Sequence, residues 1–309
     1  MKLTVHIGTT KTGSTSIQAF LRSNRAVLAA QGISYPAVLG AQHHIKAAVS
    51  ALNFRQSRDL LTHQGIQTPR ALEAYRVKVV NAYQEVIRRG AKHVIISSEH
   101  LQSRCNQPDN IERFRELFAT GFDEVQIIVY VRPQLDQLVS LYSTTLRNGA
   151  SETMHEHIER HISGKLFTYF DLQGIVQRWG AVFGEDRIIV RPYKAVPPQS
   201  KGGVVADFCL LLGLRHDDPA FTPPLETNSS IDERGQELLR IVNSNAGLDL
   251  ERRRQVVAWV ETNCSGKGAE PDLARAREFQ KRFDEGNAWV VSRYFPDHPE
   301  YLEPRWPKV

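Results

Sequence analysis

The segment with the clearest chemical character is Gly8-Thr9-Thr10-Lys11-Thr12-Gly13-Ser14-Thr15-Ser16, which lies between an apolar run and a helical pattern. A turn from a strand into a helix directs backbone N–H groups and the positive helix end outward, so it can bind an anion. Lys11 adds a positive charge, and the hydroxyls add donors. A polar turn with one Ser or Thr as helix N-cap is the simpler interpretation, but a cap needs one hydroxyl and no lysine. The sequence therefore predicts an anion site here.

The loop differs from the nucleoside triphosphate loop G-x-x-x-x-G-K-[ST], in which the lysine follows the second glycine. Gly8 and Gly13 have that spacing, but Ser14 takes the lysine position and Lys11 lies two residues before Gly13. An Asp that could hold Mg²⁺ at the end of a later apolar run is also missing, because residues 125–131 lead into Arg132. Without Mg²⁺ ligands a triphosphate would be poorly compensated. A less highly charged leaving group fits better.

The segment from His6 to Ser16 resembles the 5′-phosphosulfate loop of sulfotransferases that use 3′-phosphoadenosine 5′-phosphosulfate (PAPS), with its usual K-T-G-[ST]-[ST] core. The resemblance implies that Lys11 contacts the bridging oxygen and stabilises negative charge on the departing 3′,5′-bisphosphate. The hydroxyls and amides of residues 12–16 would hold the 5′-phosphate. No metal is required for this chemistry.

A second segment, Val129 to Tyr142, contains a strand that ends at Arg132, then a proline-initiated helix that carries Ser140. It resembles the 3′-phosphate site of the same family, where the planar guanidinium and the hydroxyl bind the phosphate. The alternative is that Arg132 pairs with Asp136 or another carboxylate and that Ser140 fills a helix surface.

Further resemblance covers most of the chain but is less specific. Residues 179–193 resemble the family stretch that leads into a strand and an aromatic residue near the adenine, here Tyr193, while 228–230 and 287–295 resemble bacterial members. The R-K-G-x-x-G segment of cytosolic animal enzymes is missing, and the turn Lys201-Gly202-Gly203 is a weak candidate for closing over the donor. The donor-binding set implied by the resemblance is Thr10, Lys11, Thr12, Gly13, Ser14, Thr15, Ser16, Arg132, Ser140 and Tyr193.

Sulfuryl transfer also needs a base on the acceptor side, opposite the leaving group. Glu99 follows the apolar run 94–97, and the carboxyl ends of parallel strands are where α/β sites form, so Glu99 is the first choice. Its alternative role is that of a carboxylate at a helix start. His100 is either a second candidate base or a substrate contact, and His43 and His44 are rivals of which at most one is expected to face the site. Ligand spacing for zinc is not visible.

A third group of histidines, His155, His157 and His161, falls at helical spacing within residues 154–162. We expect an exposed polar helix there, bordering the acceptor cleft. The nearby aromatic residues Phe167, Tyr169 and Phe170 either stack on an acceptor or belong to the core.

The elements that position these residues can be read from four β-branched runs, at 3–7, 94–97, 125–131 and 188–190, each continuously apolar. Such runs are typical of strands covered on both faces. Helical periodicity lies between them, so an α/β chain with crossover connections is predicted, and the resemblance implies a central parallel sheet flanked by helices in a three-layer, P-loop NTPase-like sandwich. From Asp207 onward the pattern is helical, with helices predicted at 231–242, 252–260 and 274–283. We expect one domain over 1–309, with a core at 1–205 and a helical extension at 206–309.

Composition agrees with this interpretation. The chain has 309 residues, 41% hydrophobic and 24% charged, with a formal net charge of +5, so it is an ordinary globular protein with a sizeable core. It contains no membrane-length apolar stretch and no signal-like start, so we expect a cytoplasmic protein. Three scattered cysteines indicate neither disulfides nor a metal site. Oligomeric state cannot be read from the sequence.

The sequence thus predicts a PAPS-dependent sulfotransferase of the EC 2.8.2 class, acting on a hydroxyl or amine. Its acceptor is expected to be a small molecule or a glycan, either a carbohydrate or a glycolipid met at a membrane surface, and nucleic acid is not expected as a partner. The alternatives are a nucleotide kinase-like phosphotransferase, which would need Mg²⁺, and a nucleotide-binding protein without catalysis.

Overall fold

The computed structural model describes residues 1–164, 167–193, 203–223, 230–245 and 249–308. The chain divides into two compact units. The core unit consists of Met1–Val131 with Leu172–Leu225, and the helical unit consists of Arg132–Asp171 with Glu226–Val309. This division differs from the expected change at residue 205: Arg132–Asp171 belongs to the helical unit, and residues 206–223 belong to the core unit.

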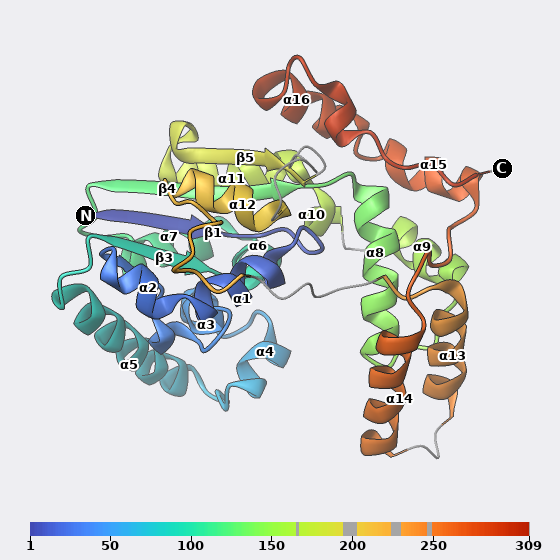
Figure 1. Ribbon diagram of the computed structural model, residues 1–309, viewed down its shortest axis with the longest axis horizontal. Coiled ribbons are helices and arrows are strands. Elements are labelled where there is room, and N and C mark those ends of the chain that lie inside the picture. Colours follow the sequence, from blue (N-terminus) through green and yellow to red (C-terminus); the bar gives the residue numbers. More distant parts are fainter. Residues whose placement is uncertain (165–166, 194–202, 224–229, 246–248, 309) are drawn as a thin grey trace. The chain divides into compact units, whose positions relative to one another are not determined.

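The described part of the core unit contains one parallel sheet in the order β2-β3-β1-β4-β5 (Figure 1). Four of these strands match the predicted apolar runs, while β2 has two residues and is too short to leave a pattern. The α/β class with a central parallel sheet flanked by helices is therefore confirmed. The strands are β1 (Lys2–His6), β2 (Ile33–Ser34), β3 (His93–Ser97), β4 (Glu124–Val131) and β5 (Ile188–Pro192).

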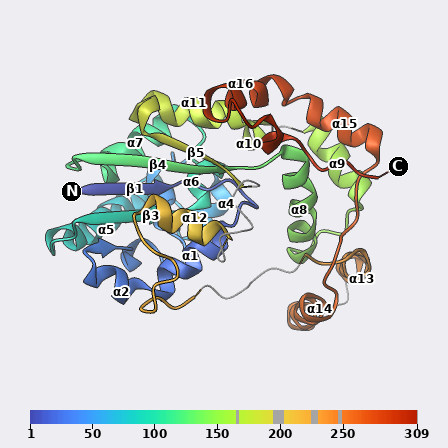
Figure 2. The same ribbon diagram turned by 45° about the horizontal axis from the view of Figure 1, so that its top comes forward.

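Helices cover both faces of this sheet (Figures 1 and 2). The helices of the core unit are α1 (Ser14–Ser23), α2 (Arg25–Ala30), α3 (Ile45–Ala51), α4 (Arg58–His63), α5 (Pro69–Arg88), α6 (Glu99–Ser103), α7 (Pro108–Phe118), α11 (Leu172–Phe183) and α12 (Gly203–Leu211), with 3₁₀ turns η1 (Ala37–Leu39) and η2 (Glu185–Arg187).

One face of the sheet is covered by α1, α2 and α12. Phe20 of α1 and Phe208 of α12 are fully buried with Ile128 and Tyr130 of β4 in one hydrophobic cluster. The helical pattern that follows β1 is interrupted at Asn24, whose Nδ2 donates to the carbonyl oxygens of residues 20 and 222 at 2.9 Å each. Burial of this apolar face fixes the direction in which α1 leaves the loop after β1.

The other face is covered by aromatic packing between α5, α7 and α11. The ring centroid of Phe114 lies 5.8 Å from that of Trp179, and Tyr83 and Phe118 are 5.3 Å apart. The Tyr83 hydroxyl also donates to the Phe118 carbonyl at 3.1 Å. These contacts join the three helices that come before β3, β4 and β5 in the chain, namely α5, α7 and α11.

In the helical unit, the described elements that the structure names are all helical. Leu135 and Leu138 of α8 pack with Phe279 of α15, and Leu146 packs with Val260 of α14. The predicted helices at 231–242, 252–260 and 274–283 are confirmed with shifted ends. No helix in the described ranges is both long and apolar enough to cross a membrane. The elements are α8 (Gln134–Arg147), α9 (Met154–Ser163), α10 (Phe167–Phe170), α13 (Glu233–Ser244), α14 (Leu250–Asn263), α15 (Leu273–Lys281), α16 (Asp284–Tyr294) and the 3₁₀ turn η4 (Pro299–Leu302).

Candidate functional site

The loop between β1 and α1 has an unusual backbone. Gly8 has φ 50° and Gly13 has φ 81°, and Lys11 between them has φ 66° although it carries a side chain. A left-handed conformation costs a residue other than glycine about 1–2 kcal/mol, so it persists only where the surroundings impose it. Such strain concentrates at functional sites, and here it falls on the lysine that the sequence singles out.

Gly8 and Gly13 cannot be replaced without strain, because both have a positive φ and a Cβ at either position would clash with a neighbouring side chain. A Cβ at Gly8 would lie 2.6 Å from the Ser14 Oγ, and one at Gly13 would lie 2.6 Å from the Val204 Cγ1 and 3.3 Å from the Tyr193 Cε2. The loop is therefore packed against Tyr193 and against the start of α12. The structure brings Tyr193 to the loop, whereas Lys201 and Gly202 of the suggested closing turn lie outside the described residues.

The start of α1 is open to an acceptor. Gly13 is the N-cap, no side chain caps the helix, and its first turn has no acidic residue. Within the described ranges, the backbone N–H groups of Gly13, Ser14 and Thr15 donate to no acceptor. Unsatisfied N–H groups and the positive helix end can together bind an anion, since each group needs an acceptor.

Two buried side chains next to this helix start also lack partners. The Ser14 Oγ and the His6 Nε2 are buried without a hydrogen bond, and both border the space over Gly8. His6 is fully buried, and burial lowers the pKa of its imidazole to about 3, so the ring is neutral at pH 7. Its Nδ1 lies 2.8 Å from the Ser97 Oγ. Sequence reasoning missed His6 as a site residue because a strand-end histidine gives no signal by itself.

Not every loop hydroxyl is free for a ligand. The Thr9 Oγ1 donates to the Tyr130 carbonyl at 2.7 Å, and the Thr12 Oγ1 donates to the Thr9 carbonyl at 2.6 Å. Both side chains are fully buried. These bonds stabilise the conformation of the loop. Because its hydroxyl hydrogen is already used, Thr12 would donate to an anion through its backbone N–H. Thr10 and Ser16 are half-buried and Thr15 is exposed.

The carboxyl end of β3 lies beside that of β1, because Ser97 is in register with His6 and the Ser98 N–H donates to the His6 carbonyl at 3.0 Å. Gln18 of α1 reaches the same place, with its Nε2 3.3 Å from the Ser97 Oγ. Glu99, the first residue of α6, is half-buried and forms no ion pair within the described ranges. The loop and the predicted base thus share one edge of the sheet.

Of the three candidate histidines, His43 and His100 lie next to each other, and His44 lies apart from them against Tyr35. The rings of His43 and His100 are 5.6 Å apart, and the Nδ1 atoms of both are buried without a partner. His44 is fully buried against Tyr35, and its Nδ1 accepts from the Ser97 N–H at 3.3 Å. Burial lowers the pKa of His100 to about 4, and the nearby His43 and Arg104 act in the same direction. Burial is also the main reason why the pKa of His44 lies well below its usual value.

The second predicted phosphate motif belongs to the helical unit. Arg132 directly follows the last residue of β4 and is half-buried, and Ser140 is half-buried on α8. The start of α8 is held within its unit, because the Gln134 side chain exchanges hydrogen bonds of 2.7 and 2.9 Å with Asn287. Asp136, the alternative partner of Arg132, accepts from the Arg305 N–H at 2.8 Å.

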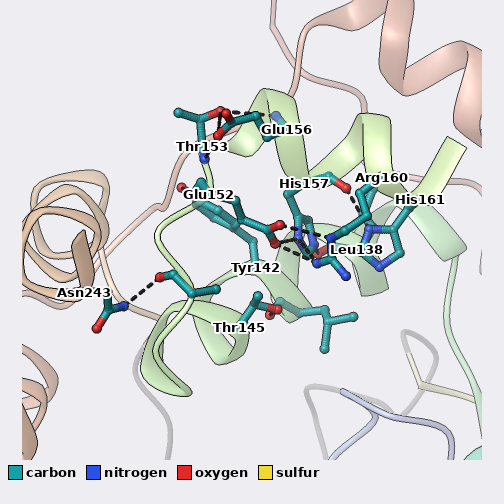
Figure 3. Close-up of polar contacts among 12 residues, drawn as sticks. Leu138, Tyr142, Thr145, Glu152, Thr153, Glu156, His157, Arg160, His161 and Asn243 are labelled. Carbon is teal, nitrogen blue, oxygen red and sulfur yellow. Dashed lines mark hydrogen bonds and ion pairs between the residues drawn. The ribbon is translucent and has the colours of Figure 1, made fainter. Parts of the chain in front are cut away.

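The expectation of an exposed histidine helix at 154–162 was wrong for His157 and His161, while His155 is exposed. On α9 the side chains of His157 and His161 are 0% and 3% exposed, because the ring of Tyr142 and the Leu138 carbonyl on α8 cover the first of them (Figure 3). Of the aromatic residues after α9, Phe170 is in the core and Phe167 is partly exposed. In the described part of the chain, no group of three or more His, Cys, Asp or Glu side chains is placed to hold a metal ion.

Comparison with known proteins gives few matches. No protein-family model matches the chain, and no curated protein matches it. Among solved structures, the chain is similar to the crystal structure of a sulfotransferase from Alicyclobacillus acidocaldarius. The match has 15% sequence identity and a TM-score of 0.47, and covers 90% of this chain and 95% of the other.

Proposed function

We propose that the chain is a PAPS-dependent sulfotransferase of the EC 2.8.2 class, formed as one domain over residues 1–309. The observation that carries the proposal is the loop before α1, where open N–H groups and the unpartnered Ser14 hydroxyl surround a strained Lys11. Donors of this kind fit a phosphate group. The lysine position of a triphosphate loop is occupied by Ser14, which favours the sulfuryl donor over a nucleoside triphosphate.

In the proposed reaction the acceptor oxygen or nitrogen forms a bond to sulfur while the bond from sulfur to the 5′-phosphate oxygen breaks. The N–H groups of Gly13 to Thr15 hold the 5′-phosphate, and Lys11 stabilises the charge that develops on the departing oxygen. Arg132 and Ser140 bind the 3′-phosphate. Tyr193, which packs on Gly13, contacts the adenosine side of the donor.

The acceptor's proton passes to a base at the end of β3. Glu99 stays our first choice, because a carboxylate that forms no ion pair within the described ranges can accept a proton. His100 is the alternative, since its imidazole is neutral at pH 7 and faces His43. His44 is less suited, because the Ser97 N–H occupies its Nδ1.

Calorimetric titration with 3′,5′-ADP and with 5′-ADP, with and without Mg²⁺, tests the donor assignment. We expect preferential binding of the bisphosphate without a metal requirement, weakened by Lys11→Ala and by Arg132→Ala. Lys78→Ala and Arg187→Ala, which remove exposed cations from α5 and η2, serve as matched controls. Equal affinity for both nucleotides would contradict the roles of Arg132 and Ser140, and an Mg²⁺-dependent preference for ATP would favour a phosphotransferase.

Transfer of labelled sulfate from PAPS to candidate glycans tests catalysis itself. Lys11→Ala should lower kcat by about 10²–10³-fold, the usual cost of one transition-state donor. Comparison of Glu99→Gln with His100→Gln identifies the base, because only loss of the true base removes the activity while bisphosphate binding persists. Loss of activity in neither variant would refute both assignments.

A further inference from the structure

The helical unit contains a cavity of about 290 Å³ that includes none of the residues assigned to donor or base. Its lining comes from α8, the turn after α8, α9 and α10, and includes Thr145, Asn148, Ala150, Arg160, His161 and Tyr169. This volume lies at the lower end for small-molecule sites and suits a ligand of about one ring.

The walls of this cavity are held by contacts outside it. The Asn243 Nδ2 donates to the Ala150 carbonyl at 2.6 Å and to the Leu146 carbonyl at 2.7 Å. Thr153 and Glu156 form a capping box at the start of α9 (Figure 3), and the Tyr142 hydroxyl donates to the Glu152 carbonyl at 3.0 Å. The backbone around the cavity is therefore held before any ligand arrives, which lowers the entropic cost of binding.

The cationic side chain that lines the cavity is paired with a carboxylate. The Arg160 Nε and Nη2 donate to the Glu152 carboxylate at 3.0 and 2.7 Å, and the His157 Nδ1 lies 2.6 Å from the same group. Burial acts to raise the pKa of Glu152, but these hydrogen bonds hold it below its usual value, so the carboxylate is ionised. Burial lowers the pKa of His161 to about 4, which leaves that ring neutral. Arg160, the charged side chain named above among the lining residues, is therefore paired with a carboxylate.

Several hydrogen-bonding groups at the cavity have no partner in the described ranges. The His161 Nδ1 donates to the His157 carbonyl at 2.7 Å, so the Nε2 of this buried ring is an acceptor. The Nη1 of Arg160 is a donor, and the amide of Asn148 supplies both kinds of group. The Thr145 hydroxyl donates to the Leu141 carbonyl at 3.1 Å and keeps its lone pairs. The cavity therefore presents both donors and acceptors.

A mixed set of donors and acceptors beside an aromatic ring, with its guanidinium already paired to a carboxylate, matches a sugar, whose hydroxyls both donate and accept and whose C–H face packs on aromatic rings. Tyr169 supplies the ring, and Leu141 supplies further apolar surface. We propose that this cavity binds one neutral pyranose ring, stacked on Tyr169 and hydrogen-bonded by Asn148 and His161. The identification of this sugar as part of the sulfate acceptor rests on the proposed function.

Saturation-transfer NMR on the full chain, without nucleotide, tests the cavity directly. The probes are methyl glycosides of glucose, galactose, mannose and N-acetylglucosamine, compared with glucuronic acid and with glucose 6-sulfate. At least one neutral glycoside should bind, and the charged sugars should bind more weakly. Tyr169→Leu should lower the affinity about fivefold or more, whereas Tyr169→Phe keeps the ring and should retain most of it. Asn148→Ala should also weaken binding, and the exposed Asn263→Ala is the matched control.

The outcomes separate the cavity from the donor site. Neutral-sugar binding that falls in Tyr169→Leu and Asn148→Ala, with unchanged thermal unfolding and unchanged bisphosphate affinity, supports the proposal. Tighter binding of the charged sugars, the same affinity in all variants, or no binding of any neutral glycoside overturns it. If the chain binds a neutral sugar but does not bind the bisphosphate, the sugar site is supported and the proposed function is refuted.

Discussion

Replacement of Gly13 by alanine is a sharp test of the loop before α1. The new Cβ would meet the Val204 Cγ1 at 2.6 Å, and the residue would keep a φ of 81° that alanine disfavours. The φ contribution is about 1–2 kcal/mol and overpacking adds about 1–3 kcal/mol. We therefore expect the free energy of unfolding to fall by about 2–5 kcal/mol.

Gly65→Ala isolates the steric part of this effect. Gly65 has a φ of 72°, and nothing lies within 4 Å of the Cβ that alanine would add. This control should lose only the φ contribution. The difference of about 1–3 kcal/mol between the two variants corresponds to about 2–12 °C in Tm and can be measured by thermal and urea unfolding.

A second variant identifies the neighbour that causes the clash. In a Val204→Ala background the Cγ1 is gone, so Gly13→Ala should cost less there than in the natural chain, and bisphosphate affinity should recover in parallel. Equal losses for Gly13→Ala and Gly65→Ala, or no change of the Gly13→Ala cost in that background, would refute the close packing of loop and α12.

Three further predictions concern groups that stabilise the core unit or the helical unit from within. Because burial lowers the pKa of His6 to about 3, only the unfolded chain takes up its proton as pH falls below about 6.5, and this residue alone should contribute about 2 kcal/mol to the loss of stability from pH 7.5 to pH 5. Urea unfolding of His6→Gln should show a flatter pH dependence. Asp207→Ala removes the acceptor of the Tyr130 hydroxyl at 2.7 Å, so it should cost about 2–3 kcal/mol by chemical unfolding. Gln134→Leu leaves Asn287 unpartnered and should cost about 1–3 kcal/mol by the same measurement, whereas Gln134→Glu keeps part of the bonding and should cost less.

The parts of the fold that the sequence predicts are those set by local pattern. Continuous apolar runs identify four strands, because a strand buried on both faces needs no alternation. The loop could be recognised because Gly8, Lys11 and Gly13 act within a few residues of one another. The two-residue β2 carries no such pattern.

The rest depends on contacts between distant segments. The burial of His157 requires Tyr142 of α8, and polar spacing on α9 alone gives the opposite answer. The pairing of His43 with His100 depends on how α3 and α6 pack, which no local period records. The closeness of Val204 to Gly13 is likewise tertiary, since these residues are far apart in the sequence.

Ser97 connects two regions that the proposed reaction uses separately. Its Oγ contacts His6 beside the loop, while its backbone N–H and carbonyl are both bonded to His44, the neighbour of His43. A ligand that shifts His6 would therefore also shift the segment before α3. We therefore expect anion binding at the loop and ligand binding at the His43–His100 pair to be thermodynamically linked. An anion at the loop and a ligand at the histidine pair should then change each other's affinity by the same factor.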